Sequence, residues 1–252
     1  MTPWKTLATV ATAEGALQLR QRGAREFLIV IGGRVLMTSN DRRSEEGLAT
    51  LACEGLAPTK RAAHGEQRAE AQQSSEARAE PGRARPRVLI GGLGMAFTVR
   101  AALDALPAGA ELVVAELTPE VRDWCLGPLA PLTGDALRDP RVRVVIDDVA
   151  RVIASAPRGH YDAIVLDLYE GPHAATQAAD DAFYGRAALE RTRAALAAGG
   201  AFAVWSEEPD EAFEKRFAAA GFAVARHRLG TSRTHIVYVG RRRDGAPRVA
   251  AR

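Results

Sequence analysis

From residue 87 onward, the chain alternates short apolar runs with segments of helical spacing, and this alternation constrains the fold more than any other feature. Alternating strands and helices are typical of a parallel sheet with helices on its faces. The apolar runs predict strands at 87–91, 111–116, 142–146, 161–166 and 201–205. Helices are predicted near 97–106, 118–126, 149–155, 181–198 and 209–220.

The end of this body departs from the alternation. The segments FAVARHRL (222–229) and THIVYVGR (234–241) both have strand patterns, and no helical segment lies between them. Two such strands are expected to pair as an antiparallel hairpin. An α/β sheet of seven strands that ends in an antiparallel hairpin is the outline of the Rossmann-like class I methyltransferase fold, which is the fold class we expect.

The N-terminal part has a different pattern. Alternating residues at 16–23, a β-rich run at 25–31 and a Gly-Gly pair before 34–39 predict a small β-rich unit, and a helix is expected at 44–56. A unit of this size is too small to be stable alone, so it should pack on the body.

A low-complexity segment separates these two parts. Residues 57–86 contain no Val, Ile, Leu, Met, Phe, Trp, Tyr or Cys, so they cannot bury enough apolar surface to offset the entropy cost of ordering. We therefore predict a flexible linker here. The predicted organisation is a small N-terminal unit at 1–56, the linker at 57–86, a ligand-binding transferase domain at 87–240 and a basic flexible tail at 241–252.

The positive charge lies mainly outside the body. The formal net charge is +3, but the linker contributes +2 (six Lys or Arg against four Glu) and the tail +4 (five Arg against one Asp). The remainder therefore carries about −3, which argues against a nucleic-acid-binding surface.

No apolar run is long enough to span a membrane, and the N-terminus lacks the apolar core of a secretory signal. We therefore expect a cytoplasmic protein with no membrane partner. Cys53 and Cys125 have no metal-type spacing, so neither a disulfide nor a metal site is predicted.

A glycine cluster marks the first strand-to-helix corner of the body. In the stretch RVLIGGLGMAFTVRAALDAL (87–106), Gly91, Gly92 and Gly94 leave room for a ligand to approach the backbone, next to the free amides of a helix N-terminus. A dinucleotide site usually has a third glycine where this chain has Phe97. The corner therefore predicts a nucleoside site that does not require a pyrophosphate.

Acidic residues end the next two strands. Glu116, followed by Leu117, lies 25 residues beyond Gly91, where an acid can accept both hydroxyls of a ribose. Asp147 and Asp148 end the third strand and can accept from an adenine amino group, while the Val149 amide donates to the ring. Thr118 before Pro119 is expected to cap the next helix. Together these residues predict an adenosine site for S-adenosylmethionine or a close derivative.

The fourth strand leads into YDAIVLDLYEGPH (161–173). Asp167, Tyr169 and Glu170 follow it at the carboxyl edge of the sheet, where open α/β sheets bind ligands. An acid beside a sulfonium centre can bind a cationic amine and take its proton. We therefore predict these three residues as catalytic, with Asp167 also contacting the cofactor.

As an assembly, these motifs resemble the spermidine synthase family of aminopropyltransferases and its methyltransferase-like relatives. VLIGGLGMAFTVRAAL is similar to the family's glycine motif, VVAEL to its ribose-binding strand, DDVARVI to its adenine loop and YDAIVLDLYEGP to its catalytic strand. The resemblance covers residues 87–210, and more weakly the N-terminal hairpin and helix. It implies that Glu116 binds the ribose, Asp148 the adenine and Asp167 the reacting amine, with Glu170 as a second substrate-binding acid. It also implies a possible homodimer.

The chain departs from the family pattern at two places. Family members carry an aspartate in the glycine loop that holds the amino end of decarboxylated S-adenosylmethionine, and the nearest position here is Gly94. Leu36, Ser44 and Glu45 stand where the family has a Gln and a Tyr-His type pair. An acid at Gly94 would repel the carboxylate of intact S-adenosylmethionine, whereas free amides would accept it.

The first expectation is therefore methyl transfer from S-adenosylmethionine to a small amine-bearing acceptor. The alternative is polyamine aminopropyl transfer from decarboxylated S-adenosylmethionine. A non-catalytic adenosine-binding protein is the alternative of a different class.

Overall fold

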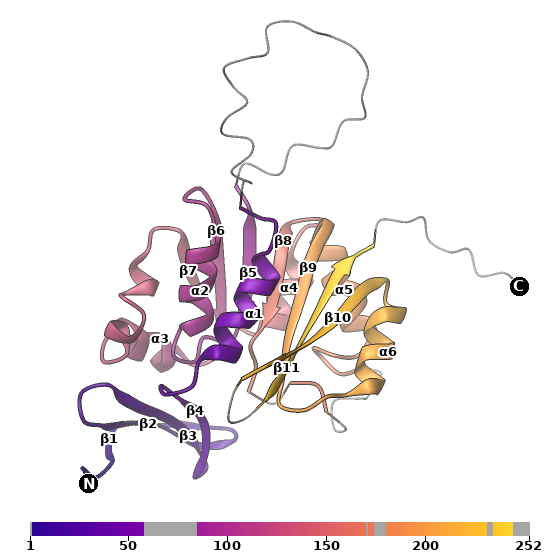
Figure 1. Cartoon of the computed structure of the whole chain (residues 1–252). Helices are drawn as coiled ribbons and strands as arrows, with labels where there is room; N and C mark the ends of the chain where they lie inside the picture. Colours follow the sequence, from indigo (N-terminus) through magenta and orange to yellow (C-terminus); the bar gives the residue numbers. More distant parts are fainter. Residues whose placement is uncertain (1, 58–84, 170, 174–179, 231–233, 244–252) are drawn as a thin grey trace, which may run out of the picture.

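The computed structural model describes residues 2–57, 85–169, 171–173, 180–230 and 234–243. Within these ranges the chain forms one sheet of seven strands and one of four strands (Figure 1). Most of the predicted linker (58–84) and of the predicted tail (244–252) lies outside the described residues. The tail was predicted to begin at 241, but Arg241 and Arg242 belong to the last strand, His235–Arg242, which pairs with the strand before it.

The large sheet has the order β10-β11-β9-β8-β5-β6-β7. The strands from β5 to β9 pair in parallel. Their apolar sequences suit strands that are covered by crossover connections, which bring the chain back to the same end of the sheet before the next strand begins. Strand β11 is antiparallel to β9, and β10 is antiparallel to β11, as the sequence predicts. The strands are β5 (Arg87–Gly91), β6 (Glu111–Glu116), β7 (Val142–Ile146), β8 (Tyr161–Leu166), β9 (Leu196–Ser206), β10 (Phe222–Leu229) and β11 (His235–Arg242).

Helices cover both faces of this sheet. One apolar cluster joins the sheet to α1 (Arg43–Cys53), α2 (Phe97–Ala105) and α3 (Pro119–Leu126). A second cluster on the other face joins it to α4 (Val149–Ser155), α5 (Arg186–Ala195) and α6 (Glu211–Ala219). Short 3-10 turns, η2 (Ala130–Leu132) and η3 (Ala136–Arg138), connect α3 to β7.

Helix α5 begins later than position 181, where the sequence pattern placed its start. The Asp181 side chain accepts hydrogen bonds from the amides of Phe183 (3.0 Å) and Tyr184 (2.6 Å). These bonds form a turn before the helix begins at Arg186.

The small N-terminal sheet is an antiparallel meander with the order β1-β2-β3-β4. Figure 1 shows it below the carboxyl ends of the parallel strands. The sequence did not predict its first strand, because KTLATVAT lacks a strong apolar run and forms a largely exposed edge. The strands are β1 (Lys5–Thr12), β2 (Gly15–Arg22), β3 (Glu26–Ile31) and β4 (Arg34–Thr38).

Helix α1 packs on the large sheet rather than on the small one. It contacts α2, β8, β9 and β11. Its last turn is held by Arg241 of β11, whose Nη2 donates to the carbonyls of Leu51 (3.3 Å) and Glu54 (3.0 Å). A cation at a helix C-terminus is favourable both for the free carbonyls and for the helix dipole. The N-terminal part is thus fixed to the body through α1.

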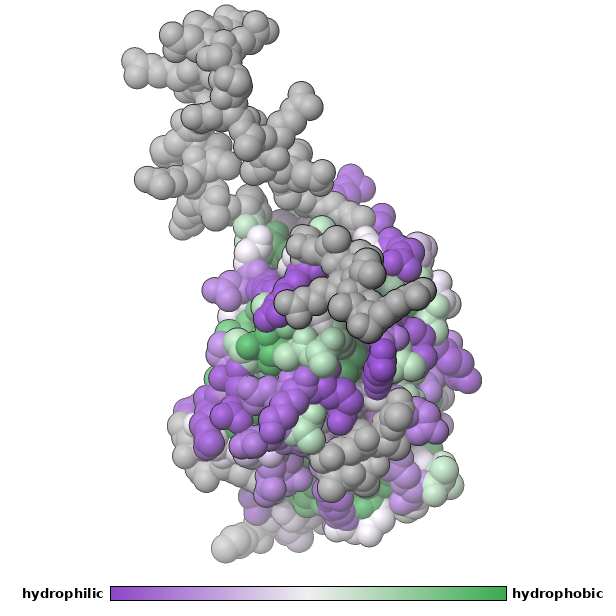
Figure 2. All heavy atoms as spheres, turned by 90° about the vertical axis from the view of Figure 1, so that its right-hand side faces the viewer, coloured by the Kyte–Doolittle hydropathy of each residue, from purple (hydrophilic) through white to green (hydrophobic). Residues whose placement is uncertain are grey.

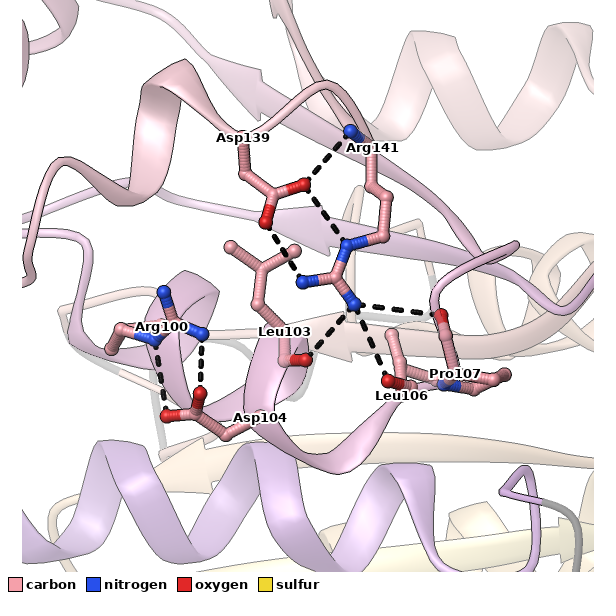
Figure 3. A network of polar contacts seen from close by, with 7 residues as sticks. All are labelled: Arg100, Leu103, Asp104, Leu106, Pro107, Asp139 and Arg141. Carbon is pink, nitrogen blue, oxygen red and sulfur yellow. Dashed lines mark hydrogen bonds and ion pairs between the residues drawn. The ribbon is translucent and has the colours of Figure 1, made fainter.

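A second arginine fixes the end of α2 (Figure 3). Arg141, just before β7, pairs with Asp139 (Nη2 to Oδ2, 2.8 Å). Its Nη1 donates to the carbonyls of Leu103 (3.1 Å), Leu106 (3.3 Å) and Pro107 (3.4 Å). The network ties the end of α2 to the start of β7, the strand whose other end carries Asp147.

Among the described residues, no helix combines the length and apolar character needed to cross a membrane. On the face drawn in Figure 2, hydrophilic side chains surround smaller hydrophobic areas.

Candidate active site

A cavity of about 450 Å³ lies at the carboxyl edge of the parallel strands, where residues of the small N-terminal sheet form part of its wall. It brings together residues that the sequence places on four separate strand ends. The predicted site residues that line it are Gly92, Gly94, Glu116, Leu117, Asp147, Asp148, Val149, Asp167 and Tyr169. Open α/β sheets bind ligands at this edge.

Among the described residues, one predicted site residue is not part of this lining. Gly91 ends β5 and packs against the core, since a Cβ there would lie 2.7 Å from Val149 Cγ2 and 2.9 Å from Leu166 Cδ2. Its role is therefore to let the strand and α4 approach each other. Glu170 lies outside the described residues.

The glycine corner brings the backbone close to β8. Gly92 has a φ of 89°, and a Cβ there would lie 2.3 Å from the Asp167 carbonyl oxygen. Gly94 has a φ of 51°, and a Cβ there would lie 2.9 Å from Met37 Sδ of β4. At Gly92 a side chain would collide with the Asp167 carbonyl oxygen, and the left-handed φ of both positions favours glycine.

Most amides of the corner already have acceptors inside the protein. The Gly92 amide donates to the Ala115 carbonyl (2.9 Å), and the Leu93 amide to Glu116 Oε2 (3.0 Å). The Met95 amide donates to Met37 Sδ (3.3 Å). The expectation that amides beside Gly94 are available for a ligand carboxylate is therefore not met at Met95, because the small N-terminal sheet supplies the acceptor.

Glu116 is held at the cavity wall by backbone amides. Besides the Leu93 bond, its Oε1 accepts from the Thr118 amide (2.8 Å). Burial raises the pKa of Glu116 above its ordinary value, although the amide bonds oppose the shift. Thr118 occupies the N-cap position of α3, but its side chain makes no capping bond, so the predicted cap is wrong. The rigid carboxylate retains lone pairs for two neighbouring hydroxyl donors.

The two aspartates after β7 have separate structural partners. Asp147 accepts from the Asp148 amide (2.8 Å) and pairs with Arg151 (2.6 Å), which lowers its pKa. Asp148 caps α4, since its Oδ1 accepts from the Ala150 amide (2.8 Å). The Val149 amide lies in the first turn of α4, where no preceding carbonyl of the helix can accept it. Each carboxylate keeps a further oxygen for a ligand amino group.

Asp167 follows β8 and is the most perturbed acid of the site. Thr98 Oγ1 of α2 donates to its Oδ2. Burial raises the pKa of Asp167 from 3.8 to about 7, repulsion from Glu45 adds to the rise, and the Thr98 bond opposes it. A carboxyl group with a pKa near neutrality can take and release a proton at physiological pH.

Several lining residues come from the N-terminal part of the chain, where the sequence marked Leu36 and Glu45 only as departures from the family pattern. Leu36, Met37 and Glu45 come from β4 and α1, and Thr12, Ala13 and Glu14 come from the end of β1 and the turn after it. Only their docking on the body places them at the cavity. Phe183 and Trp205 complete the wall on the β9 side.

The described lining is strongly acidic. It contains six carboxylates and no Lys, Arg or His. Two arginines outside the lining contact lining residues: Arg151 pairs with Asp147 and offsets its charge, and Arg34 lies over the Tyr169 ring at 5.1 Å. A cavity of this charge favours a cationic ligand over one that carries a carboxylate. The six acids are Glu14, Glu45, Glu116, Asp147, Asp148 and Asp167.

No protein-family model and no curated protein matches the sequence. Solved structures with the same fold include the spermidine synthase of Thermotoga maritima, with a TM-score of 0.68, 15% identity and coverage of 94% of this chain and 72% of that one. A spermidine synthase in complex with the transition state analogue AdoDATO gives a TM-score of 0.68, 14% identity and coverage of 94% and 73%. A probable spermidine synthase from Corynebacterium glutamicum ATCC 13032 gives a TM-score of 0.58 and 18% identity, with coverage of 96% of this chain and 81% of that one.

The chain therefore has the fold of the spermidine synthases, a Rossmann-like α/β sheet with a small N-terminal β unit. At these identities the comparison establishes the fold, and the predicted resemblance is confirmed at that level.

Proposed function

We propose that the chain is an aminopropyltransferase of the spermidine synthase type, which uses decarboxylated S-adenosylmethionine and a small primary amine. The observation that carries this proposal is the charge of the cavity, whose described lining has six carboxylates and no basic side chain. A sulfonium with an ammonium tail and an alkylammonium acceptor are both cations. Intact S-adenosylmethionine would bring an additional carboxylate into the same space.

The residues present fit the adenosine part of such a cofactor. Glu116 would accept the two ribose hydroxyls, Asp148 the adenine amino group, and the Val149 amide would donate to the ring. Leu117, 66% exposed, offers an apolar surface beside them. The cofactor would supply the sulfonium leaving group, and the protein would provide position and a place for the proton.

Methyl transfer, the first expectation from the sequence, depended on Gly94. Because Gly94 has no carboxylate, it would not repel the carboxylate of intact S-adenosylmethionine. However, the Met95 amide beside it already donates to Met37 Sδ and is not available to bind that carboxylate. Glu45 also brings a carboxylate to the same cavity from α1. Both observations favour the aminopropyl alternative.

Asp167 is positioned to act on the acceptor. An alkylammonium must lose a proton before its nitrogen can attack, and Asp167 would take that proton. The nitrogen then bonds to the carbon next to the sulfonium, the carbon–sulfur bond breaks, and its electron pair stays on sulfur as a neutral thioether. The positive charge moves from sulfur to the product nitrogen, and one proton is released to solvent in each turnover.

Isothermal titration calorimetry tests the proposal. Decarboxylated S-adenosylmethionine should bind at least tenfold more tightly than S-adenosylmethionine, and methylthioadenosine should also bind. Glu116→Ala should weaken all binding by about 1.5–3 kcal/mol, through loss of charge-assisted ribose bonds. Glu111→Ala is the matched control, because Glu111 lies at the opposite end of β6 in an exposed pair with Arg87. Equal or tighter binding of S-adenosylmethionine would contradict the proposal.

A further inference from the structure

Strand β4 contains a bulge that changes which of its side chains face the cavity. Ile29 of β3 pairs with Met37. The next residue, Val30, pairs with Val35 rather than with Leu36, which is left as an extra residue in the ladder. Successive side chains of a regular strand point to opposite faces, yet Leu36 and Met37 both line the cavity. A bulge re-aims side chains in this way, so the irregularity of β4 brings Met37 to the glycine corner.

At the corner, Met37 fills the space beside Gly94. A Cβ at Gly94 would lie 2.9 Å from Met37 Sδ and 3.5 Å from Met37 Cε. The same sulfur atom accepts the Met95 amide (3.3 Å). From the other side, the Gly94 carbonyl accepts from Cys125 Sγ of α3 (3.3 Å). The corner is therefore held between α3 and the N-terminal sheet, and Met37 is the contact from that sheet.

The Met95 amide differs from its neighbours in the kind of acceptor that it has. The Leu93 amide donates to Glu116 Oε2 (3.0 Å), and the Ala96 amide donates to the Leu93 carbonyl (2.8 Å), so both are satisfied within the body. The Met95 amide instead depends on a thioether, which is a weak and uncharged acceptor. Without Met37, this amide would be a free donor at the cavity wall, and amides that precede a helix are favourable donors for an anion.

We propose that Met37 is a specificity-determining residue that selects the tail of the cofactor, because its thioether fills the place at the glycine corner where a tail carboxylate would bind. This inference rests on the proposed function, since it assigns cofactor selection at the same site to one side chain. A tail that ends in an amine needs no donor at this place. A tail with a carboxylate would find the Met95 amide already bonded and the acids Glu45 and Glu116 in the same lining. Met37 thus provides selectivity by exclusion.

Calorimetry with three thioether ligands tests the role of Met37 without requiring turnover. S-adenosylhomocysteine has a tail with an amine and a carboxylate, its decarboxylated form has the amine alone, and methylthioadenosine has neither. Met37→Ala removes the sulfur and opens the space beside Gly94. This variant should bind S-adenosylhomocysteine about 10- to 100-fold more tightly than wild type does, through a charge-assisted bond from the Met95 amide. Its affinity for methylthioadenosine should change by less than about twofold, because that ligand has no tail to place there.

Two further variants separate the hydrogen bond from the volume of the side chain. Met37→Gln is similar in size and can accept the Met95 amide, so it should exclude S-adenosylhomocysteine as wild type does. Met37→Leu is also similar in size but has no acceptor, so it should bind S-adenosylhomocysteine at least about threefold more tightly than the Gln variant. This comparison decides the question if Met37→Ala does not fold.

Leu36→Ala is the matched control, because it enlarges the same cavity from the neighbouring residue of β4. It should leave the ratio of the affinities for S-adenosylhomocysteine and its decarboxylated form unchanged. An equal change of this ratio in Leu36→Ala and Met37→Ala would overturn the role of Met37, as would equal binding of S-adenosylhomocysteine to the Leu and Gln variants. If wild type binds no methylthioadenosine, the proposed function itself fails, which separates the two results.

Discussion

The buried charge of Asp167 leads to a prediction about stability that does not depend on any ligand. A carboxyl group whose pKa is higher in the folded state binds more protons there than in the unfolded chain. The folded-state pKa of Asp167 is about 7, against an ordinary value of 3.8, mainly because of burial. The free energy of unfolding should therefore fall as pH rises from about 4 to about 7. Asp167→Asn removes this loss and can keep the Thr98 hydrogen bond.

The size of the effect follows from the interval between the two pKa values. At about 1.4 kcal/mol per pH unit, that interval sets a ceiling of about 4 kcal/mol for the gain of Asp167→Asn above pH 7. Between pH 5 and pH 8 the advantage of the variant should grow by about 2–3 kcal/mol.

Urea unfolding at pH 5 and pH 8 measures this difference. Asp147→Asn is the control, because an arginine lowers the pKa of Asp147, and it should show no gain at pH 8. An advantage of Asp167→Asn that stays constant between the two pH values, or no advantage at pH 8, would refute the buried-charge argument.

Two further predictions concern the framework of the site. Arg141→Ala should lower the free energy of unfolding by about 2–3 kcal/mol, because it leaves the carbonyls at the end of α2 without their donor. Arg100→Ala should cost at most about 0.5 kcal/mol, since the hydrogen bonds of Arg100 are to Asp104 in the same helix, in a partly exposed ion pair. Equal losses in urea unfolding would contradict this. Gly92→Ala should cost about 1–3 kcal/mol more than Gly134→Ala and should weaken methylthioadenosine binding. Both glycines have positive φ, but only a Cβ at Gly92 meets a neighbouring carbonyl oxygen, so equal costs would show that this contact is unimportant.

The large sheet could be predicted closely from the sequence. The central parallel strands β5, β6 and β8 are largely buried on both faces and are therefore nearly continuous apolar runs, whereas the edge strand β7 is only partly buried. The segments 87–91, 111–116, 142–146 and 161–166 match the observed strands. Strand β1 was missed because an exposed edge rich in Thr and Ala lacks such a run.

The candidate site was predictable only where it follows strand ends. The corner glycines and the acids after β6, β7 and β8 have fixed positions relative to the sheet, so their meeting follows from the fold. The contributions of Met37, Glu45 and Trp205 depend on how the N-terminal sheet and α1 dock and on side-chain packing after β9. No local sequence pattern encodes that docking. The docking is also the reason that we favour aminopropyl transfer over methyl transfer, because Met37 Sδ accepts the hydrogen bond of the Met95 amide next to Gly94.

The most direct test of the proposed function is mass spectrometry of the products formed from primary alkylamines with each cofactor. With decarboxylated S-adenosylmethionine, the proposal predicts an acceptor that gains an aminopropyl group and an equal amount of methylthioadenosine. With S-adenosylmethionine, it predicts no methylated amine. A methylated amine and S-adenosylhomocysteine, with no aminopropyl product, would contradict the proposed function and restore methyl transfer.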